Sequence, residues 1–134
     1  MIVADTNLIA YLLLPGQRTA EAEAVLRRDA AWSAPLLWKS ELRNVLASYV
    51  RAGRLGMEHA LDLAEKAESL LAPREFTVPT RDVLLLAASS GCAAYDCEFV
   101  VLARELGVPL VTSDRALLDA FPETATTPER FAHG

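Results

Sequence analysis

Short apolar runs alternate with longer helical segments along the whole chain, and this alternation restricts the fold more than any other feature. The apolar runs are too short for helices and indicate buried strands. They lie at residues 1–4, 31–34, 75–78 and 110–112, with a shorter candidate edge strand at 124–127. Because helices separate successive strands, the strands should be parallel and joined by right-handed crossovers. We therefore predict an α/β fold with a central parallel β-sheet of four to five strands and helices on both faces.

Helical periodicity or strong helix formers mark the segments between these strands. The expected helices begin near Leu8 and then cover residues 19–29, 36–52, 57–71, 80–90, 95–106 and 115–120. Three glycines follow the ends of these segments, where glycine commonly stops a helix; they are Gly53, Gly91 and Gly107. Beyond Pro128 the sequence is weakly patterned, and we predict no element there.

The helix at 57–71 carries more apolar residues than one contact with a core requires. We expect its buried side to hold Met57, Ala60, Leu61, Ala64 and Leu71. A second set widens the apolar stripe, namely Leu63, Ala67 and Leu70. This pattern indicates burial between two layers or, alternatively, a groove for a partner.

The length of 134 residues indicates one domain, which we place at residues 1–134 with its core at about 2–127. Charged residues or prolines interrupt every apolar run before the ~20 residues that a membrane span needs. No basic residue precedes the apolar start, as one would in a signal peptide. We therefore expect a cytoplasmic protein with no membrane segment. Cys92 and Cys97 form neither a disulfide framework nor a zinc pattern, so we expect packed thiols.

The net charge of −5 argues at first against a nucleic-acid partner. Four of the 18 acids, however, belong to one candidate site, and without them 14 acids face 13 bases, a balance of −1. Eleven of the bases are arginines, whose planar guanidinium group favours bidentate contact with phosphate. This composition is compatible with RNA or DNA binding and establishes neither.

Asp5 stands where the first strand ends and the first helix begins, and Thr6 and Asn7 follow it. In an open α/β sheet, ligands bind at the carboxyl ends of the strands. The same residue types are also common helix N-caps. Taken alone, Asp5 therefore fits a helix cap and an active-site acid equally well.

Three further acids occupy positions of the same kind. Glu41 lies on the apolar side of its helix, where a carboxylate is costly unless it pairs with an arginine or binds a metal. Asp96 opens a helix, which is ordinary because of the helix dipole. Asp114 directly follows the strand at 110–112 and can equally cap the next helix.

Taken together, the four acids predict one metal site. Asp5 and Asp114 end separate parallel strands, whose carboxyl ends share one edge of the sheet. Four like charges at one place would repel and raise one another's pKa values, a penalty that divalent cations remove. A carboxylate site without Cys or His selects hard ions such as Mg²⁺ or Mn²⁺. Such ions can activate water and stabilise the reacting oxygens in phosphodiester hydrolysis.

The order of these motifs resembles that of the PIN-domain nucleases. The matching stretches are Asp5-Thr6-Asn7, Glu41-Leu42-Arg43-Asn44, Tyr95-Asp96 with Val100-Val101-Leu102-Ala103, and Thr112-Ser113-Asp114. Each stretch is short, but their order and spacing from residue 2 to about 127 are specific together. The short length and the lack of other domains resemble most closely the VapC-type toxins of toxin–antitoxin pairs.

The resemblance implies both a site and a function. The acidic quartet that holds Mg²⁺ or Mn²⁺ and forms the catalytic centre would be Asp5, Glu41, Asp96 and Asp114. The residues that orient these carboxylates or a water on the metal would be Thr6 or Asn7, and Thr112 or Ser113. The implied activity is that of a metal-dependent endoribonuclease, which acts on RNA as a toxin until a cognate antitoxin neutralises it. Such proteins usually form homodimers, and here the helices at 36–52 and 57–71 would wall the antitoxin groove.

Cations should guide the RNA phosphates, and those nearest in sequence to the quartet are Arg43, Lys39 and Arg115. One alternative reading is a catalytically inactive PIN-like module that binds RNA or a protein partner. A less favoured alternative is a phosphatase with Asp5 as its nucleophile. Haloacid-dehalogenase-like phosphatases need a second Asp two residues later, where this chain has Asn7, and a late Lys, whereas no Lys follows Lys66.

Overall fold

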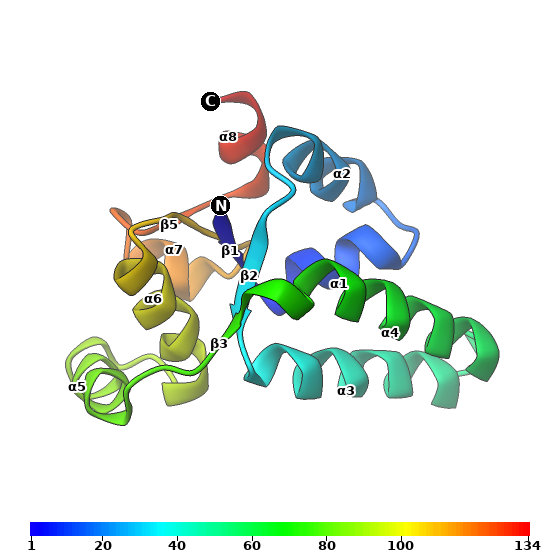
Figure 1. The fold of residues 1–134 in the computed structure, drawn as a ribbon, viewed down its shortest axis with the longest axis horizontal. Coiled ribbons are helices and arrows are strands. Elements are labelled where there is room, and N and C mark those ends of the chain that lie inside the picture. The colour runs from blue at the N-terminus through cyan, green and yellow to red at the C-terminus, as the bar shows by residue number, and fades with distance from the viewer.

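The computed structural model describes residues 1–134 and has a five-stranded sheet in which every strand pairing is parallel (Figure 1). The strand order is β3-β2-β1-β4-β5. The strands are β1 (Ile2–Ala4), β2 (Trp32–Pro35), β3 (Glu75–Phe76), β4 (Leu110–Val111) and β5 (Ala125–Thr126). The predicted parallel sheet is confirmed, including its short edge strand.

The helices flank the sheet on both faces, as predicted. In Figure 1, α5 and α6 lie to one side of the strands and α1 to α4 to the other. The helices are α1 (Thr6–Leu13), α2 (Thr19–Arg28), α3 (Leu37–Arg51), α4 (Met57–Leu71), α5 (Thr80–Ser90), α6 (Ala94–Leu106), α7 (Arg115–Ala120) and α8 (Pro128–His133), with one 3₁₀ turn, η1 (Ala72–Arg74). Gly91 and Gly107 end α5 and α6 with φ values of 77° and 67°, a left-handed conformation that glycine adopts without strain.

Strand β1 lies at the centre of the core. All three of its side chains are fully buried, as expected for a parallel strand covered on both faces. The largest fully buried side chains around it come from both layers, since Trp32 is on β2, Trp38 on α3 and Phe99 on α6. Because β1 is buried on both faces, the position of the next residue, Asp5, is fixed as well.

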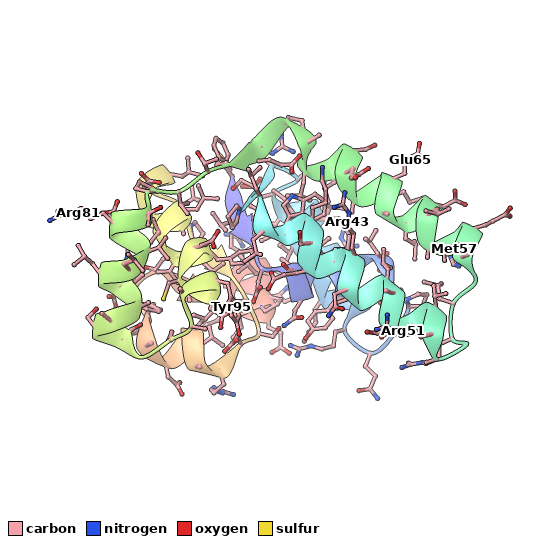
Figure 2. The ribbon with its side chains drawn as sticks, turned by 90° about the horizontal axis from the view of Figure 1, so that it is seen from below. Arg43, Arg51, Met57, Glu65, Arg81 and Tyr95 are labelled. Atoms are coloured by element: carbon pink, nitrogen blue, oxygen red, sulfur yellow. The ribbon has the colours of Figure 1, made fainter.

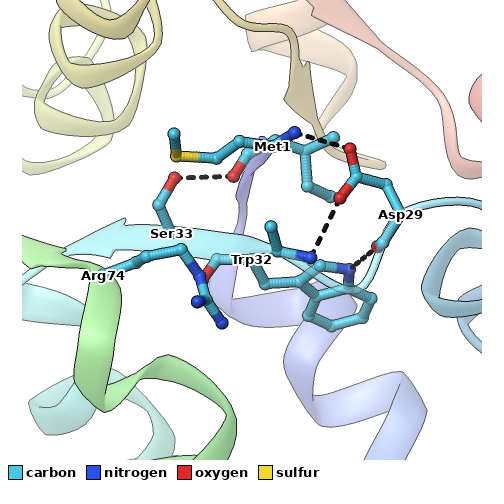
Figure 3. A network of polar contacts seen from close by, with 7 residues as sticks. Met1, Asp29, Trp32, Ser33 and Arg74 are labelled. Carbon is cyan, nitrogen blue, oxygen red and sulfur yellow. Dashed lines mark hydrogen bonds and ion pairs between the residues drawn. The ribbon is translucent and has the colours of Figure 1, made fainter.

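A polar network ties the starts of β1 and β2 together (Figure 3). The amino group of Met1 donates to Asp29 Oδ2 at 2.6 Å, and the indole nitrogen of Trp32 donates to the Asp29 carbonyl at 2.9 Å. The hydroxyl of Ser33 donates to the carbonyl of Ile2 at 2.6 Å, within the buried sheet. These bonds hold the register of the two strands, in which Ile2 pairs with Trp32.

Two expectations were wrong in detail. On α4, Met57 and Leu61 are 59% and 61% exposed. Ala60 and Leu71 are buried as predicted, Ala64 is half-buried, and the other buried residues, Leu63 and Ala67, come from the set that widens the stripe. The end of the chain, for which we predicted no element, forms α8, which packs against α2. The hydroxyl of Thr127 accepts from the Arg130 amide at 3.1 Å and caps this helix.

No single helix is long and apolar enough to cross a membrane. Helices α5 and α6 reach that length and apolarity only as a pair bent by 115°. Much of α6 is buried in the core beside the sheet.

Candidate active site

Asp5 is the first residue after β1 and lies between two strands. Its amide donates to the Val111 carbonyl at 3.1 Å, which joins the end of β1 to the end of β4. Its side chain is only 9% exposed and makes no cap bond to α1. Instead, Asp5 Oδ2 accepts from the hydroxyl of Thr112 at 2.5 Å. The hydrogen bond that holds the Asp5 side chain in place therefore comes from the end of another strand and not from its own helix.

Asp114 follows β4 and belongs to the same corner of the sheet. It does cap its helix, because Oδ1 accepts from the amides of Ala116 at 2.9 Å and Leu117 at 3.2 Å. The Asp114 amide donates to Thr112 Oγ1 at 3.0 Å. One threonine hydroxyl thus bonds to both acidic residues, and Asp114 Oδ2 remains outside the cap bonds.

Glu41 reaches the site from α3. Its Oε1 accepts from the hydroxyl of Thr6 at 2.7 Å, which ties α3 to the first residue of α1. Asp96, in the first turn of α6, arrives from the opposite layer. Figure 2 views the molecule from below, toward the carboxyl ends of the strands, with Arg43 on α3 and Tyr95 at the start of α6 labelled.

The four acids line a single cavity of about 220 Å³. We call it the acidic cavity, and its other walls are Thr6, Asn7, Asn44 and Val45. Strand order explains its place: β2 and β4 lie on opposite sides of β1, so a crevice opens where the chain reverses its direction of winding. The structure thus brings together every acid of the predicted quartet, while what they bind stays a prediction.

The electrostatics of this cavity are unfavourable without a cation. Burial raises the pKa of Asp5, and the charge of Asp114 adds to the rise, whereas the Thr112 hydrogen bond opposes it. Burial also raises the pKa of Glu41 and of Asp96, and each feels the charge of Asp5. Three carboxyls with raised pKa values in one cavity mark it as a candidate functional site, and a bound cation would favour their ionised forms.

The type of ligand atom fits a hard divalent ion, since all four acidic side chains offer carboxylate oxygens. Their arrangement is nevertheless open: no three Asp, Glu, His or Cys side chains are close enough to hold an ion as they stand. Thr6 and Thr112 hold two of the carboxylates in place, and Asp96 has no such bond. Binding an ion therefore requires the side chains to turn toward one another.

The other predicted site residues differ in their placement. Thr6 and Thr112 donate to quartet acids, and Asn7 lines the cavity. The hydroxyl of Ser113 is buried without a hydrogen-bond partner and does not line the cavity.

The suggested cations are not in the cavity wall. Lys39 Nζ lies 3.7 Å from Glu68 and 3.8 Å from Glu75, so its charge is already paired. Arg43 and Arg115 are exposed and line no part of the cavity. Asn44, which does line it, had been assigned no role, although its position three residues after Glu41 places it on the same side of α3.

A parallel sheet with a reversal of winding at its centre, and four acids gathered at that point, define an α/β domain with an acidic ligand site. The PIN domain model matches residues 2–122, so the chain belongs to the PIN-domain family. The family resemblance drawn from the motifs is confirmed.

Similar proteins extend over nearly the full chain. Ribonuclease VapC3 of Pyrobaculum aerophilum is 29% identical over 128 residues, 93% of this chain and 98% of that protein. The crystal structure of PAE2754 from the same organism has a TM-score of 0.78 at 23% identity, covering 98% of this chain and 92% of its own. A toxin–antitoxin complex from Klebsiella pneumoniae has a TM-score of 0.68 at 17% identity, with 96% and 98% covered. At these identities the two structures show a shared fold.

Proposed function

We propose that this protein is a metal-dependent endoribonuclease that hydrolyses phosphodiester bonds in RNA. The observation that carries the proposal is the convergence of four carboxylates from β1, α3, α6 and the β4–α7 junction on one cavity. A relative that covers almost the whole chain is a ribonuclease, which supports RNA as the substrate. We place the activity in the cytoplasm, where translated RNA is found.

In this proposal Asp5, Glu41, Asp96 and Asp114 hold Mg²⁺ or Mn²⁺. When bound, a divalent ion supplies charge that activates water and stabilises the developing charge on the phosphodiester. Thr112 and Thr6 donate hydrogen bonds to Asp5 and Glu41, which favours their ionised forms and fixes their orientation. The amides of Asn7 and Asn44 stand at the cavity wall, within reach of a bound phosphate or sugar.

We further propose that the protein acts as a toxin that a cognate antitoxin neutralises. The similarity to a solved toxin–antitoxin complex and to a VapC ribonuclease supports this role. The acidic cavity opens beside α3, so a segment that packs on α3 and α4 can cover it and exclude RNA.

We also propose that the protein forms a homodimer through the exposed face of α5. Leu84 and Leu85 on this helix are 59% and 57% exposed. Beside them lies a cavity of about 350 Å³ between α5 and α6, whose walls hold Leu85, Leu86 and Val101 together with Asp82, Ser89, Arg104 and Glu105. Burying adjacent exposed leucines in a homodimer removes this apolar area from water.

The test is RNA cleavage by the purified protein with Mg²⁺, with Mn²⁺ and with a chelator. We expect metal-dependent cleavage of single-stranded RNA by the parent and a loss of at least about 100-fold in Asp96→Asn, which keeps the side-chain shape and removes the charge. Glu65→Gln on α4 (Figure 2) removes one exposed acidic charge and keeps the side-chain shape, so it serves as the matched control and should cleave normally. The proposal would be refuted if the parent cleaved RNA equally well with and without chelator. It would also be refuted if Asp96→Asn cleaved RNA as fast as the parent.

A further inference from the structure

A second cavity adjoins the acidic cavity and has a different chemistry. It has a volume of about 300 Å³ and lies between α1, the loop at 14–19 and α3. Asn7 and Val45 line both cavities, so the two cavities are neighbours. The walls of the second cavity include Tyr11 from α1 and Tyr49 from α3, and we call it the tyrosine cavity.

Both tyrosines are half-buried, and each carries an arginine against its ring. The guanidinium carbon of Arg18 lies 4.8 Å from the centre of the Tyr11 ring, and that of Arg54 lies 4.5 Å from the centre of the Tyr49 ring. Such contacts are attractive and hold the guanidinium groups in place. Positive charge therefore stands beside the aromatic side chains, although Arg18 also pairs with Glu21 at 3.1 Å.

The walls of the cavity on the other side of Asp96 lack both features, although the exposed Tyr95 and Arg115 adjoin wall residues in sequence. A cavity of about 510 Å³ there shares Asp96 with the acidic cavity, and its walls include Asp119 but no Lys, Arg, Tyr, Phe or Trp. A polyanion that reaches the four acids will favour the side where cations stand. The charge distribution thus points to the tyrosine cavity as the path of the strand.

We propose that the tyrosine cavity binds one unpaired RNA base next to the phosphate that lies at the four acids. Aromatic side chains stack with any base, and arginine planes add to the stacking. The amides of Asn7 and Gln17 in its walls can pair with base edges. A base held in stacked pairs within a duplex cannot enter, so the cavity selects single strands. This inference rests on the proposed nuclease function and names a substrate-binding part of it.

The experiment measures RNA binding apart from cleavage. Fluorescence anisotropy follows a labelled eight-nucleotide RNA of random sequence on the full chain carrying Asp96→Asn. Tyr11→Leu and Tyr49→Leu keep an apolar side chain and remove the aromatic face. We expect each to raise the Kd about tenfold, within the range for losing a base stack. Tyr11→Phe and Tyr49→Phe should keep the parent affinity within about twofold, because the ring remains.

Three controls sharpen the result. Glu65→Gln should bind as the parent does, because it lies on α4, away from both cavities. A ribose-phosphate chain of equal length without bases should bind weakly and be insensitive to the leucine changes. Unchanged melting temperatures will show that the half-buried tyrosines were replaced without unfolding.

Parent-like RNA affinity in both leucine variants would overturn the base-binding role, as would equal affinity of the parent for the chain without bases. If those variants bind RNA normally, and the same leucine changes in the chain with Asp96 intact escape neutralisation by the antitoxin on co-expression, the cavity serves the antitoxin and the proposal is wrong. A different result is that the parent chain binds RNA in a tyrosine-dependent way and yet cleaves no RNA with Mg²⁺ or Mn²⁺. That result would contradict the proposed nuclease function and leave the base-binding role of the tyrosine cavity standing.

Discussion

At the scale of single residues, Thr112 has the most consequential position. Its buried hydroxyl donates to Asp5 and accepts from the Asp114 amide, so one atom positions two members of the quartet. Partners of ligating carboxylates commonly contribute as much to a site as the ligands, since they fix orientation.

Thr112→Val removes this hydroxyl at nearly constant volume. We expect RNA cleavage or Mn²⁺ affinity to fall about 10- to 100-fold, the usual loss for such a partner. Thr112→Ser retains the hydroxyl and should therefore retain most of the RNA cleavage and Mn²⁺ affinity of the parent. Steady-state kinetics and metal titration of both variants give the measurement, and a valine variant with parental values would show that the hydroxyl has no such role.

Asp5 should cost stability when no cation is bound. Its pKa is raised by burial, so ionisation destabilises the folded state as pH rises above about 4, the ordinary value for Asp. Asp5→Asn should therefore melt higher than the parent at neutral pH in chelator, by about 4 °C per kcal/mol relieved. The difference should vanish below about pH 4, where the parent carboxyl is protonated as well.

Thermal unfolding by circular dichroism from about pH 3 to 8 measures this difference. A less stable Asp5→Asn protein at pH 7, or a difference that does not change with pH, would contradict the electrostatic account. The sequence could place Asp5 at a strand end, but it could not separate a cap from a ligand. The hydrogen bond that positions its side chain comes from Thr112, 107 residues away, and the sequence gives no sign of that contact.

At the scale of elements, α4 shows where periodicity fails. Apolar residues occur on more than one side of this helix, so the pattern alone selected a stripe that includes the exposed Met57 and Leu61. Packing against α3 and β2 decides which side is buried, and it selects Leu63. Helix α8 escaped prediction because six residues are too few to show a period, and its contacts with α2 stabilise it.

Two leucines on α4 provide a matched pair. Leu63 is 4% exposed and Leu61 is 61% exposed. Leu63→Ala should lower the free energy of unfolding by about 2–5 kcal/mol through lost burial and a cavity. Leu61→Ala should change it by less than about 0.5 kcal/mol. Urea unfolding of the two variants tests the orientation of α4, and equal losses would show it to be wrong.

At the scale of the whole molecule, alternating strands and helices were enough to predict a parallel sheet with helices on both faces. The strand order was not predictable, because it depends on which face each crossover helix packs against. That order places β1 beside β4 and so brings Asp5 and Asp114 together. Arg18, which lines the tyrosine cavity, and Arg54, which lies against the Tyr49 ring, were missed because both are distant from the acids in sequence.

The proposed homodimer has its own test. Leu85→Glu places a charge on the exposed apolar face of α5, and we expect it to convert a dimer into a monomer in size-exclusion chromatography with light scattering. Leu61→Glu, an equally exposed leucine on α4, should leave the dimer intact. A parent that is monomeric at micromolar concentration, or dissociation by the α4 change alone, would exclude α5 as the interface.

The central claim is that four acids at the β1–β4 crevice hold a divalent ion, and calorimetric titration with Mn²⁺ tests it most directly. We predict saturable binding to the parent, accompanied by a rise in melting temperature. Binding should weaken by at least about tenfold in both Asp5→Asn and Glu41→Gln, since each loses a charged ligand. Mn²⁺ affinity that is the same in the parent and in both variants would contradict the account.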